Sequence, residues 1–408
     1  MQPYLVVFAV SAGVTFVATP LVRRLSLRLG WIDQPSDRKV HPKPTPTVGG
    51  LAIFVGVVAA LGVTHVLPSL TTLHETTSEL DAALVAGAVI VLVGLVDDTR
   101  GLSPLGKLAG QVLAAGLLVL AGVQLLYFYF PGQGVLSLSP DLAVPVTVVW
   151  IAAMVNAVNL IDGLDGLAAG MVAIGAIAFF VYMAFGPTAS EDPSSATVLS
   201  VVVAGAAIGF LPWNFYPAKI FMGDTGSGLL GLMLAVATIS GVGRNPLGPS
   251  GGDLAAIAIP VILPLLVLAI PFLDVVLAVV RRMRKGLGVH HADKEHIHHR
   301  LMDIGHSQRQ AVLLMYLWSA LISGCALAVA FIDGRLLVIG IVTAAVLFAV
   351  VLPKLLRDRN PRGSDLAAGD QVAREGASTI QIPEAEGGSS GASHPPVEPE
   401  TPRGAAAR

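Results

Sequence analysis

The stretch Ala153–Gly170, AMVNAVNLIDGLDGLAAG, places two Asn and two Asp between two strongly apolar runs. It follows LAVPVTVVWIA and continues directly into MVAIGAIAFFVYMAF. The chain of 408 residues is 54% hydrophobic and only 13% charged, which is roughly half the charged share of a soluble domain. Apolar runs of about 20 residues, the length that crosses a hydrocarbon core, recur along it. The sequence therefore predicts a membrane protein that crosses the bilayer many times.

The apolar runs are continuous rather than alternating, which favours helices over a barrel. We therefore expect an all-α fold of about eleven transmembrane helices within residues 1–356. Residues 357–408 are rich in Pro, Gly, Ser, Ala and Glu and predict a disordered cytoplasmic tail. The expected spans centre near Gly13, Gly56, Ala88, Ala115, Val149, Ala176, Ala204, Leu232, Leu266, Leu321 and Ala344.

The basic residues predict the orientation of these spans. Lys and Arg concentrate in the segments that begin at Arg23 and Arg281, whereas the loops on the other side carry almost none. Because cytoplasmic loops are enriched in Lys and Arg, we expect the N-terminus outside and the C-terminus in the cytoplasm. A net charge of −2 indicates no nucleic-acid partner.

The polar clusters GLVDDTRG, NLIDGLDG, PWNFYPAKIFMGDTGSG and the His-rich loop all fall at the cytoplasmic ends of spans. Asn156, Asn159 and Asp162 share one broad helix face, so they could bind a ligand or metal, or hydrogen-bond to neighbouring helices. Asp97 and Asp98 form a repelling pair that a cation would relieve, although such a pair can simply end a helix.

Asp224 lies between glycines and beside hydroxyl groups. Glycines let the backbone approach a phosphate, and a carboxylate beside them suits Mg²⁺. The alternative is that Asp224 or Thr225 merely caps the following helix. The letters DTGS, which begin at Asp224, also occur in aspartic proteases. Because so short a motif is weak evidence out of context, a protease is disfavoured.

The loop HADKEHIHHR gathers three histidines and an arginine within five positions, His296, His298, His299 and Arg300. Arginine binds phosphate oxygens bidentately and histidine donates to them, so this loop suits a diphosphate. A solvated basic loop is the alternative, and a zinc site fits the spacing poorly. Together the clusters predict Mg²⁺-assisted phosphoryl chemistry at the membrane boundary.

Five motifs, DRKVH, GLVDD, NAVNLIDGLDGLAAG, PAKIFMGDTGSG and HIHHRL, resemble those of the polyprenyl-phosphate N-acetylhexosamine-1-phosphate transferase family. The resemblance covers about Asp33 to Ala311. It implies transfer of a sugar 1-phosphate from a UDP-sugar to a polyprenyl phosphate with release of UMP. It also implies a requirement for Mg²⁺, for which Mn²⁺ could substitute.

The resemblance implies roles for individual residues. Asp224 would bind the metal with Asn159, while Asp97 and Asp98 would lie at the reaction centre, with Asp98 as the base that activates the lipid phosphate. The donor would be bound by Asn156, Asp162, Asp165, Asn214, Phe221, His296, His298, His299 and Arg300. Lys39 and His41 would close over the site.

Pro42 stands where the peptidoglycan branch of the family has a Lys, and with Arg300 this departure favours the UDP-GlcNAc branch. Its product, on undecaprenyl or decaprenyl phosphate, would begin a cell-envelope polysaccharide such as O-antigen, teichoic acid or, as we favour, arabinogalactan. The enzyme would lie in a bacterial plasma (inner) membrane with its site facing the cytoplasm. A phospho-MurNAc-pentapeptide transferase and a transporter of a nucleotide- or lipid-linked solute stay open as alternatives, as does a homodimer.

Overall fold

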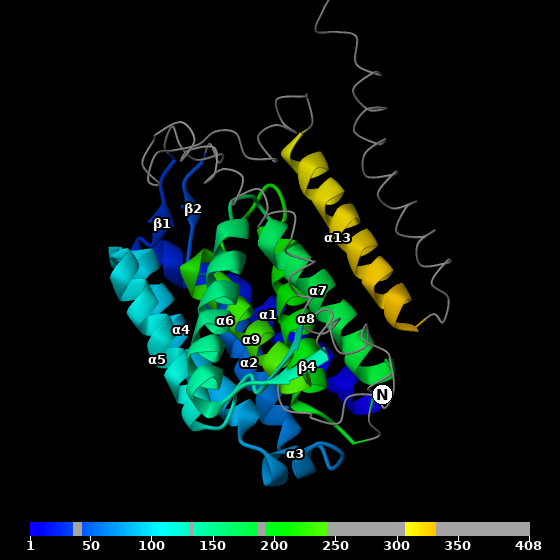
Figure 1. The fold of residues 1–408 in the computed structure, drawn as a ribbon. Coiled ribbons are helices and arrows are strands. Elements are labelled where there is room, and N and C mark those ends of the chain that lie inside the picture. The colour runs from blue at the N-terminus through cyan, green and yellow to red at the C-terminus, as the bar shows by residue number, and fades with distance from the viewer. Residues whose placement is uncertain (36–42, 131–133, 187–188, 190–191, 243–306, 332–408) are drawn as a thin grey trace, which may run out of the picture. The chain divides into compact units, whose positions relative to one another are not determined.

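The computed structural model describes residues 1–35, 43–130, 134–186, 189, 192–242 and 307–331. Within them the chain is mainly helical (Figure 1). The helices are α1 Gln2–Leu29, α2 Gly50–Thr64, α3 Thr71–Thr76, α4 Glu79–Arg100, α5 Pro104–Leu120, α6 Pro140–Ile161, α7 Leu167–Phe185, α8 Ser195–Asn214, α9 Gly223–Val242 and α13 Gln308–Phe331.

The expectation of an all-α fold is wrong in one respect, because two short antiparallel strand pairs join the helices. β1 (Ile32–Asp33) pairs with β2 (Thr45–Pro46), with Ile32 opposite Pro46. β3 (Tyr127–Phe130) pairs with β4 (Gly134–Ser137), with Tyr127 opposite Ser137. Both pairs lie in connections between helices. Connections of this length carry too few residues for a strand pattern to show in the sequence.

Every predicted span centre that falls on described residues lies inside a helix. Six of the described helices are long and apolar enough to cross a membrane: Gln2–Leu29, Glu79–Arg100, Pro140–Ile161, Leu167–Phe185, Ser195–Asn214 and Gln308–Ala328. Helices α2 and α5 are apolar but shorter. A polytopic membrane protein is thus confirmed, whereas the total of eleven spans and their orientation stay predictions. The centres at Leu266 and Ala344, and the tail 357–408, lie outside the described residues.

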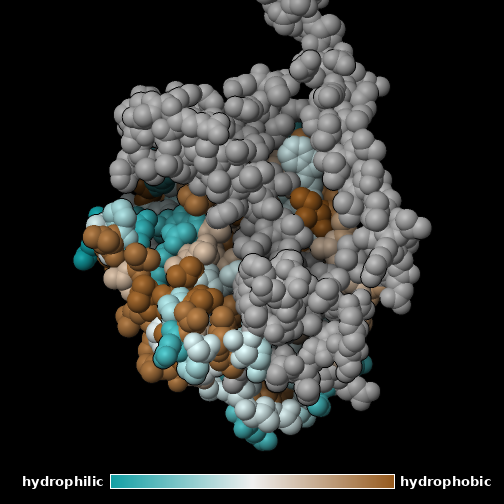
Figure 2. Space-filling view, viewed as in Figure 1, coloured by the Kyte–Doolittle hydropathy of each residue, from teal (hydrophilic) through white to brown (hydrophobic). Residues whose placement is uncertain are grey.

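Helix α9 lies in the middle of the bundle and packs on α4, α6, α8 and α2 (Figure 1). It is apolar all round, as expected of a helix that is surrounded by others. Small residues allow the close approach: a Cβ on Gly231 would lie 2.8 Å from the backbone of α6. The outer helices instead expose large apolar side chains, such as Leu92 of α4 and Leu113 and Leu120 of α5. These outer faces, partly visible in Figure 2, suit contact with lipid.

The packing brings four helix ends together. Gly50 at the start of α2 lies against the first turn of α9, since a Cβ there would be 2.1 Å from the Gly226 nitrogen. Gly94 in α4 makes a similar contact, with a Cβ only 2.5 Å from Thr225. The start of α5 follows α4 within a few residues. One end of the bundle therefore collects the polar termini of α4, α5 and α9.

Candidate active site

Three carboxylates converge at this end of the bundle. Asp97 and Asp98 lie in the last turn of α4, and Asp224 lies in the first turn of α9. One oxygen from each can be chosen so that all three lie within 4.8 Å of one another. The side chains of Asp97 and Asp224 are only 14% and 25% exposed. Such a grouping of partly buried acids is unfavourable unless positive charge lies among them.

Lys107 supplies positive charge in this structure. Its Nζ lies 2.6 Å from Asp97 Oδ2 and 2.5 Å from Asp224 Oδ2. The start of α5 sets its position: the Ser103 hydroxyl accepts from the Gly106 amide at 3.2 Å, which is a helix N-cap. Asp97 also accepts the Leu102 amide at 2.8 Å through Oδ1. The ammonium thus marks a point between two carboxylates at which a cation is stable.

Asp98 holds the first turn of α9 in place. Its Oδ1 accepts the Asp224 amide at 2.8 Å, and its Oδ2 accepts the Thr225 amide at 3.1 Å and the Thr225 hydroxyl at 2.6 Å. These are amide groups that a helix start leaves unpaired. Gly223 has φ of +71°, and a Cβ there would lie 2.3 Å from Asp98 Oδ2. The cap of α9 therefore comes from α4, and glycine is required beside it.

Helix α6 contributes amide and carboxylate groups from the opening stretch. The Asn159 side chain hydrogen-bonds to Asp224. Asp162 follows the last residue of α6, where burial raises the pKa of its carboxyl, and the nearby charges of Asp98, Asp224 and Asp165 raise it further. The site thus carries several carboxyls against one ammonium among the described residues. Mg²⁺ prefers oxygen ligands of this kind, so Asp224, Asn159 and the Asp97–Asp98 pair fit a divalent cation.

Two connecting loops close one side of the site. Asn214, which is 1% exposed, accepts the Gly166 amide at 3.1 Å and donates to the Ile220 carbonyl at 3.1 Å. Asp165 accepts the Ala218 amide at 2.9 Å. The loop after α6 is therefore tied to the loop before α9. The Tyr316 hydroxyl of α13 donates to the Gly166 carbonyl, so α13 also contacts the loop after α6.

The segment before α2 joins the same loop. Phe221 donates its amide to the Pro46 carbonyl at 2.8 Å, and its carbonyl accepts the Gly49 amide at 2.9 Å. Between them, Val48 has φ of 63° and is fully buried. A β-branched residue rarely adopts this conformation, and such strain gathers at functional sites. The TPTVGG segment is thus positioned against the backbone of Phe221.

Comparison with known proteins agrees with this geometry. Residues 80–242 match the model of glycosyl transferase family 4. The chain is 42% identical over 364 residues to the decaprenyl-phosphate N-acetylglucosaminephosphotransferase of Mycolicibacterium smegmatis, covering 87% of this chain and 89% of that protein. The protein of the same name from Mycobacterium leprae is 42% identical over 361 residues, 86% of this chain and 90% of its own.

A more distant relative is the probable undecaprenyl-phosphate N-acetylglucosaminyl 1-phosphate transferase of Bacillus subtilis. It is 37% identical over 312 residues, which cover 76% of this chain and 81% of that protein. The chain belongs to the polyprenyl-phosphate N-acetylhexosamine-1-phosphate transferase family. The resemblance drawn from five sequence motifs is confirmed.

The structure of the transferase brings together most of the predicted acids. Asp97, Asp98, Asp224, Asn159 and Asp162 lie around one point. Their individual roles stay predictions, as do those of Asp165, Asn214 and Phe221 in the adjoining loops. The predicted residues Lys39, His41, His296, His298, His299 and Arg300 lie outside the described residues.

Asn156 lies one turn before Asn159 in α6 and makes a different contact. Its Nδ2 donates to Gln111 Oε1 of α5 at 2.8 Å and to the Ala152 carbonyl at 2.7 Å. This is the hydrogen bonding between helices that the sequence left open as the alternative. Its predicted part in substrate binding is neither required by this contact nor tested by it.

Sequence reasoning missed Lys107 and the partner of Thr225. The segment SPLGK carried a signal, because Ser103 and Pro104 mark a helix start and Lys107 is the one cation in the apolar run that follows. Lys107 lies four residues into a helix that begins soon after the GLVDD motif, and this closeness along the chain could have placed the lysine near the acids. Capping of the following helix by Asp224 or Thr225 was only the alternative interpretation, and nothing local in the sequence shows that the Thr225 hydroxyl contacts Asp98.

Proposed function

We propose that the transferase moves GlcNAc-1-phosphate from UDP-GlcNAc to a polyprenyl phosphate, either undecaprenyl or decaprenyl. UMP is released, and polyprenyl-diphospho-GlcNAc is formed as the first membrane step of a cell-envelope polysaccharide. The names of the relatives support this donor and this class of acceptor. The observation that carries the proposal is the Asp97–Lys107–Asp224 contact at one end of an apolar helix bundle.

The reaction exchanges one phosphorus–oxygen bond for another. An oxygen of the lipid phosphate attacks the sugar-bearing phosphorus of UDP-GlcNAc, and the bond from that phosphorus to the oxygen of the UMP phosphate breaks. We favour this direct attack over a covalent enzyme intermediate. Mg²⁺ would supply charge neutralisation at the diphosphate. The groups of the chain that would hold it are Asp224 and Asn159, with Mn²⁺ as a substitute for Mg²⁺.

Lys107 has a natural role in this reaction. Its ammonium lies between two carboxylates that a divalent cation would also contact. With Mg²⁺ held by Asp224 and Asn159, the flexible four-carbon stem of Lys107 would let its ammonium turn toward a phosphate oxygen of the donor. Lys107 then adds positive charge where negative charge moves onto the leaving UMP.

The family resemblance implies that Asp98 is the base, and its contacts in the structure suggest a second role, the positioning of Asp224. Three hydrogen bonds from α9 occupy both of its carboxylate oxygens and fix Asp224 beside it. The second pKa of a phosphate monoester is about 6, so most of the lipid phosphate is already ionised at neutral pH. The demand on a base is therefore small, and we expect Asp98 to contribute mainly by positioning Asp224.

The site is proposed to face the cytoplasm of a bacterial plasma membrane. The concentration of Lys and Arg in the segments starting at Arg23 and Arg281 supports this orientation. The C-terminus would then lie on the same side. A homodimer is compatible with the proposal and is not required by it.

Release of UMP by the purified full-length protein tests the proposal. The assay combines Mg²⁺ and decaprenyl or undecaprenyl phosphate with UDP-GlcNAc, UDP-GalNAc or UDP-MurNAc-pentapeptide. We expect UMP with UDP-GlcNAc at least tenfold faster than with either other donor. Preference for UDP-MurNAc-pentapeptide would move the enzyme to the peptidoglycan branch, and absence of UMP with every donor would favour a transporter.

A further inference from the structure

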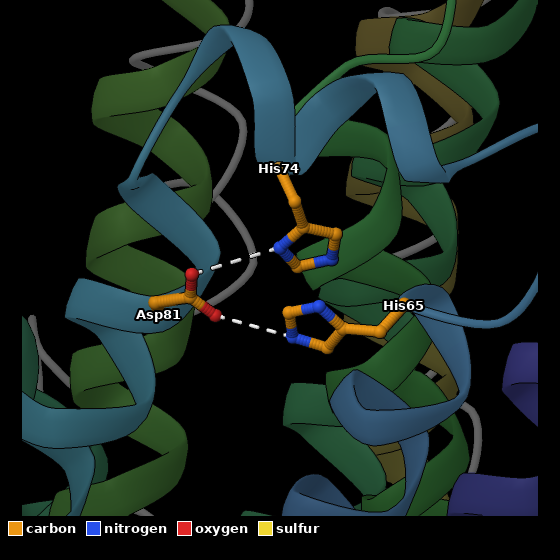
Figure 3. A group of neighbouring side chains, drawn as sticks. All are labelled: His65, His74 and Asp81. Atoms are coloured by element: carbon orange, nitrogen blue, oxygen red, sulfur yellow. Dashed lines mark ion pairs between the residues drawn. The ribbon is translucent and has the colours of Figure 1, made fainter.

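A second cluster of metal-binding groups lies far from the acids, where α2 ends and α4 begins. His65 directly follows α2, His74 lies in α3, and Asp81 lies in the first turn of α4 (Figure 3). Asp81 and Asp97 are 16 residues apart on the same helix, which corresponds to about 24 Å of helix length. We propose that His65, His74 and Asp81 form a site for a divalent transition metal of the zinc class.

The three side chains already converge. His65 Nε2 lies 3.4 Å from Asp81 Oδ1, and His74 Nδ1 lies 3.6 Å from Asp81 Oδ2. Figure 3 shows both rings directed at the same carboxylate. In a tetrahedral site with zinc bonds of about 2.0–2.1 Å, neighbouring ligand atoms are about 3.3 Å apart. The observed separations run to two different carboxylate oxygens and are longer than ordinary hydrogen bonds. One ligand atom from each of the three residues lies within 4.8 Å of the others, so small side-chain rotations would bring them to the tetrahedral separation.

The contacts of Thr64 determine which nitrogen of His74 carries a proton. The Thr64 hydroxyl donates its single hydrogen to the Leu61 carbonyl at 2.5 Å, so its oxygen must accept from His74 Nε2 at 2.8 Å. In a neutral ring Nδ1 then carries the lone pair. That atom is buried and has no hydrogen-bond partner among the described residues, although it faces Asp81. Two acceptors thus face each other across a gap that a cation would fill.

The hydrogen bond from His74 to Thr64 is of the kind that supports histidines in metal sites. A histidine ligand usually donates its second ring N–H to an oxygen, which fixes the ring and the nitrogen that binds. Thr64 provides that oxygen for His74. The side chain of His74 is 11% exposed, whereas those of His65 and Asp81 are 50% and 53% exposed. The buried ligand is therefore pre-oriented, and solvent can supply a fourth ligand from the open side.

A proton alone explains the cluster less well. The two rings are stacked, with centroids 3.6 Å apart and planes 21° apart. Two positively charged rings at that separation would repel each other, whereas a single cation between the rings and the carboxylate would serve both. A metal ion contacts both nitrogens and the carboxylate together, after a rotation of the half-exposed His65 ring tilts its lone pair toward the ion. Imidazole ligands favour Zn²⁺ or a similar ion over Mg²⁺.

Cobalt and zinc binding to the purified full-length protein tests the site. The protein is stripped of metal with a chelator and titrated with Co²⁺, then with Zn²⁺. Excess Mg²⁺ is present throughout, so that it occupies the carboxylates of Asp97, Asp98 and Asp224. The reference is the His65→Ala/Asp81→Asn variant, which changes the two more exposed ligands. Histidines elsewhere in the chain are the same in both proteins, so their binding cancels in the difference.

We expect the unaltered protein to bind one more equivalent of metal than the variant. We also expect visible Co²⁺ absorption bands of four-coordinate intensity, and a rise in the melting temperature on adding Zn²⁺ that the variant lacks. Equal stoichiometry and equal Co²⁺ spectra would overturn the proposal. UMP release with Mg²⁺ should stay within twofold of normal in the variant, which separates this site from the transferase site.

Thr64→Val sharpens the test because it keeps all three ligands. Loss of the oxygen that orients His74 should weaken Zn²⁺ binding about 10- to 100-fold. The matched control is Thr19→Val in α1, whose hydroxyl donates to its own helix at 2.6 Å and which should bind Zn²⁺ normally. Unchanged affinity in Thr64→Val, or a cluster that responds to pH and to no metal, would show that His65, His74 and Asp81 form an ion pair only.

Discussion

The two ends of α4 differ in the chemistry of the groups they collect. The last turn brings Asp97 and Asp98 to Asp224 and Lys107, whereas the first turn brings Asp81 to two imidazole rings. Oxygen ligands at the first of these sites suit Mg²⁺, and nitrogen ligands at the second suit a zinc-class ion. The choice of ligand atoms, rather than the helix that carries them, therefore decides which cation each end can hold.

The two ends also differ in packing. At the acid end, backbones approach so closely that glycine is required at Gly50, Gly94 and Gly223. At the histidine end, a Cβ added to Gly62 would meet no described atom within 4 Å apart from its chain neighbours and the nearby backbone of its own helix. Two of the three proposed ligands there, His65 and Asp81, are half exposed. A reaction that moves phosphoryl groups needs fixed geometry, which fits the closer packing at the acid end.

The comparison predicts opposite outcomes for the same substitution at the two ends. Asp224→Asn should reduce turnover about a thousandfold, because it weakens the binding of Mg²⁺. The metal would stabilise the negative charge that develops in the transition state by several kcal/mol. Asp81→Asn should leave turnover within twofold. UMP release at saturating Mg²⁺ measures both. Near-normal turnover in Asp224→Asn would remove Asp224 from its role as metal ligand.

Helix α2 allows the packing difference to be measured within one element. Gly50→Ala should destabilise the protein by about 3 kcal/mol or more, since the added Cβ would meet the backbone of α9. Gly62→Ala at the other end should be neutral or slightly stabilising, because alanine favours a helix more than glycine does. Thermal unfolding in detergent compares the two. Equal melting temperatures would contradict the close contact of α2 with α9.

Lys107→Met tests whether the ammonium acts on substrate or only balances charge. We expect turnover to fall about tenfold to a hundredfold, because a positive charge near the diphosphate is lost. Arg100→Met is the control, since it removes a positive charge from the end of α4 and leaves Lys107 between Asp97 and Asp224. Steady-state kinetics with varied Mg²⁺ measures the effect. If added Mg²⁺ fully restores Lys107→Met, the lysine only replaces the metal ion in its absence.

Two threonines support the two sites in the same way. Thr225→Val removes the hydroxyl that donates to Asp98 at 2.6 Å, and should cost about 1–2 kcal/mol of stability and several-fold in turnover. Thr64→Val should change Zn²⁺ affinity and leave turnover unchanged. If Thr225→Val instead keeps full activity, the hydrogen bonds from the backbone amides to Asp98 suffice to hold Asp224.

The smallest effect is expected at the contact of Asn156 with Gln111, one helical turn away from Asn159 and Lys107. A double-mutant cycle on Asn156→Ala and Gln111→Ala should give a coupling of about 0.6 kcal/mol, the average for hydrogen bonds between membrane helices. Thermal or denaturant unfolding measures it. If Asn156→Ala raises KM for UDP-GlcNAc strongly while Gln111→Ala does not, the predicted substrate-binding role of Asn156 would be supported instead.

Several features of this transferase could be predicted from the sequence. Long apolar runs predict membrane helices, because the length needed to cross the bilayer is fixed, and the described helices lie where those runs are. The polar motifs also predicted Asp97, Asp98 and Asp224 as one site, since several polar clusters fall at the same ends of the spans and polar groups within spans are usually functional. The strand pairs were missed because they are too short to show a pattern.

By itself, then, the sequence predicted which segments are long and apolar enough to cross a membrane, the motifs of the family and the grouping of Asp97, Asp98 and Asp224. Only the tertiary structure decided that Lys107 lies between Asp97 and Asp224, that Asp98 caps a helix more than 120 residues later in the chain, and that His65 and His74 face Asp81. Hydrophobicity is a property of each segment alone and can be read locally. Contacts between helix ends depend on which helices pack together, and no local pattern records that choice.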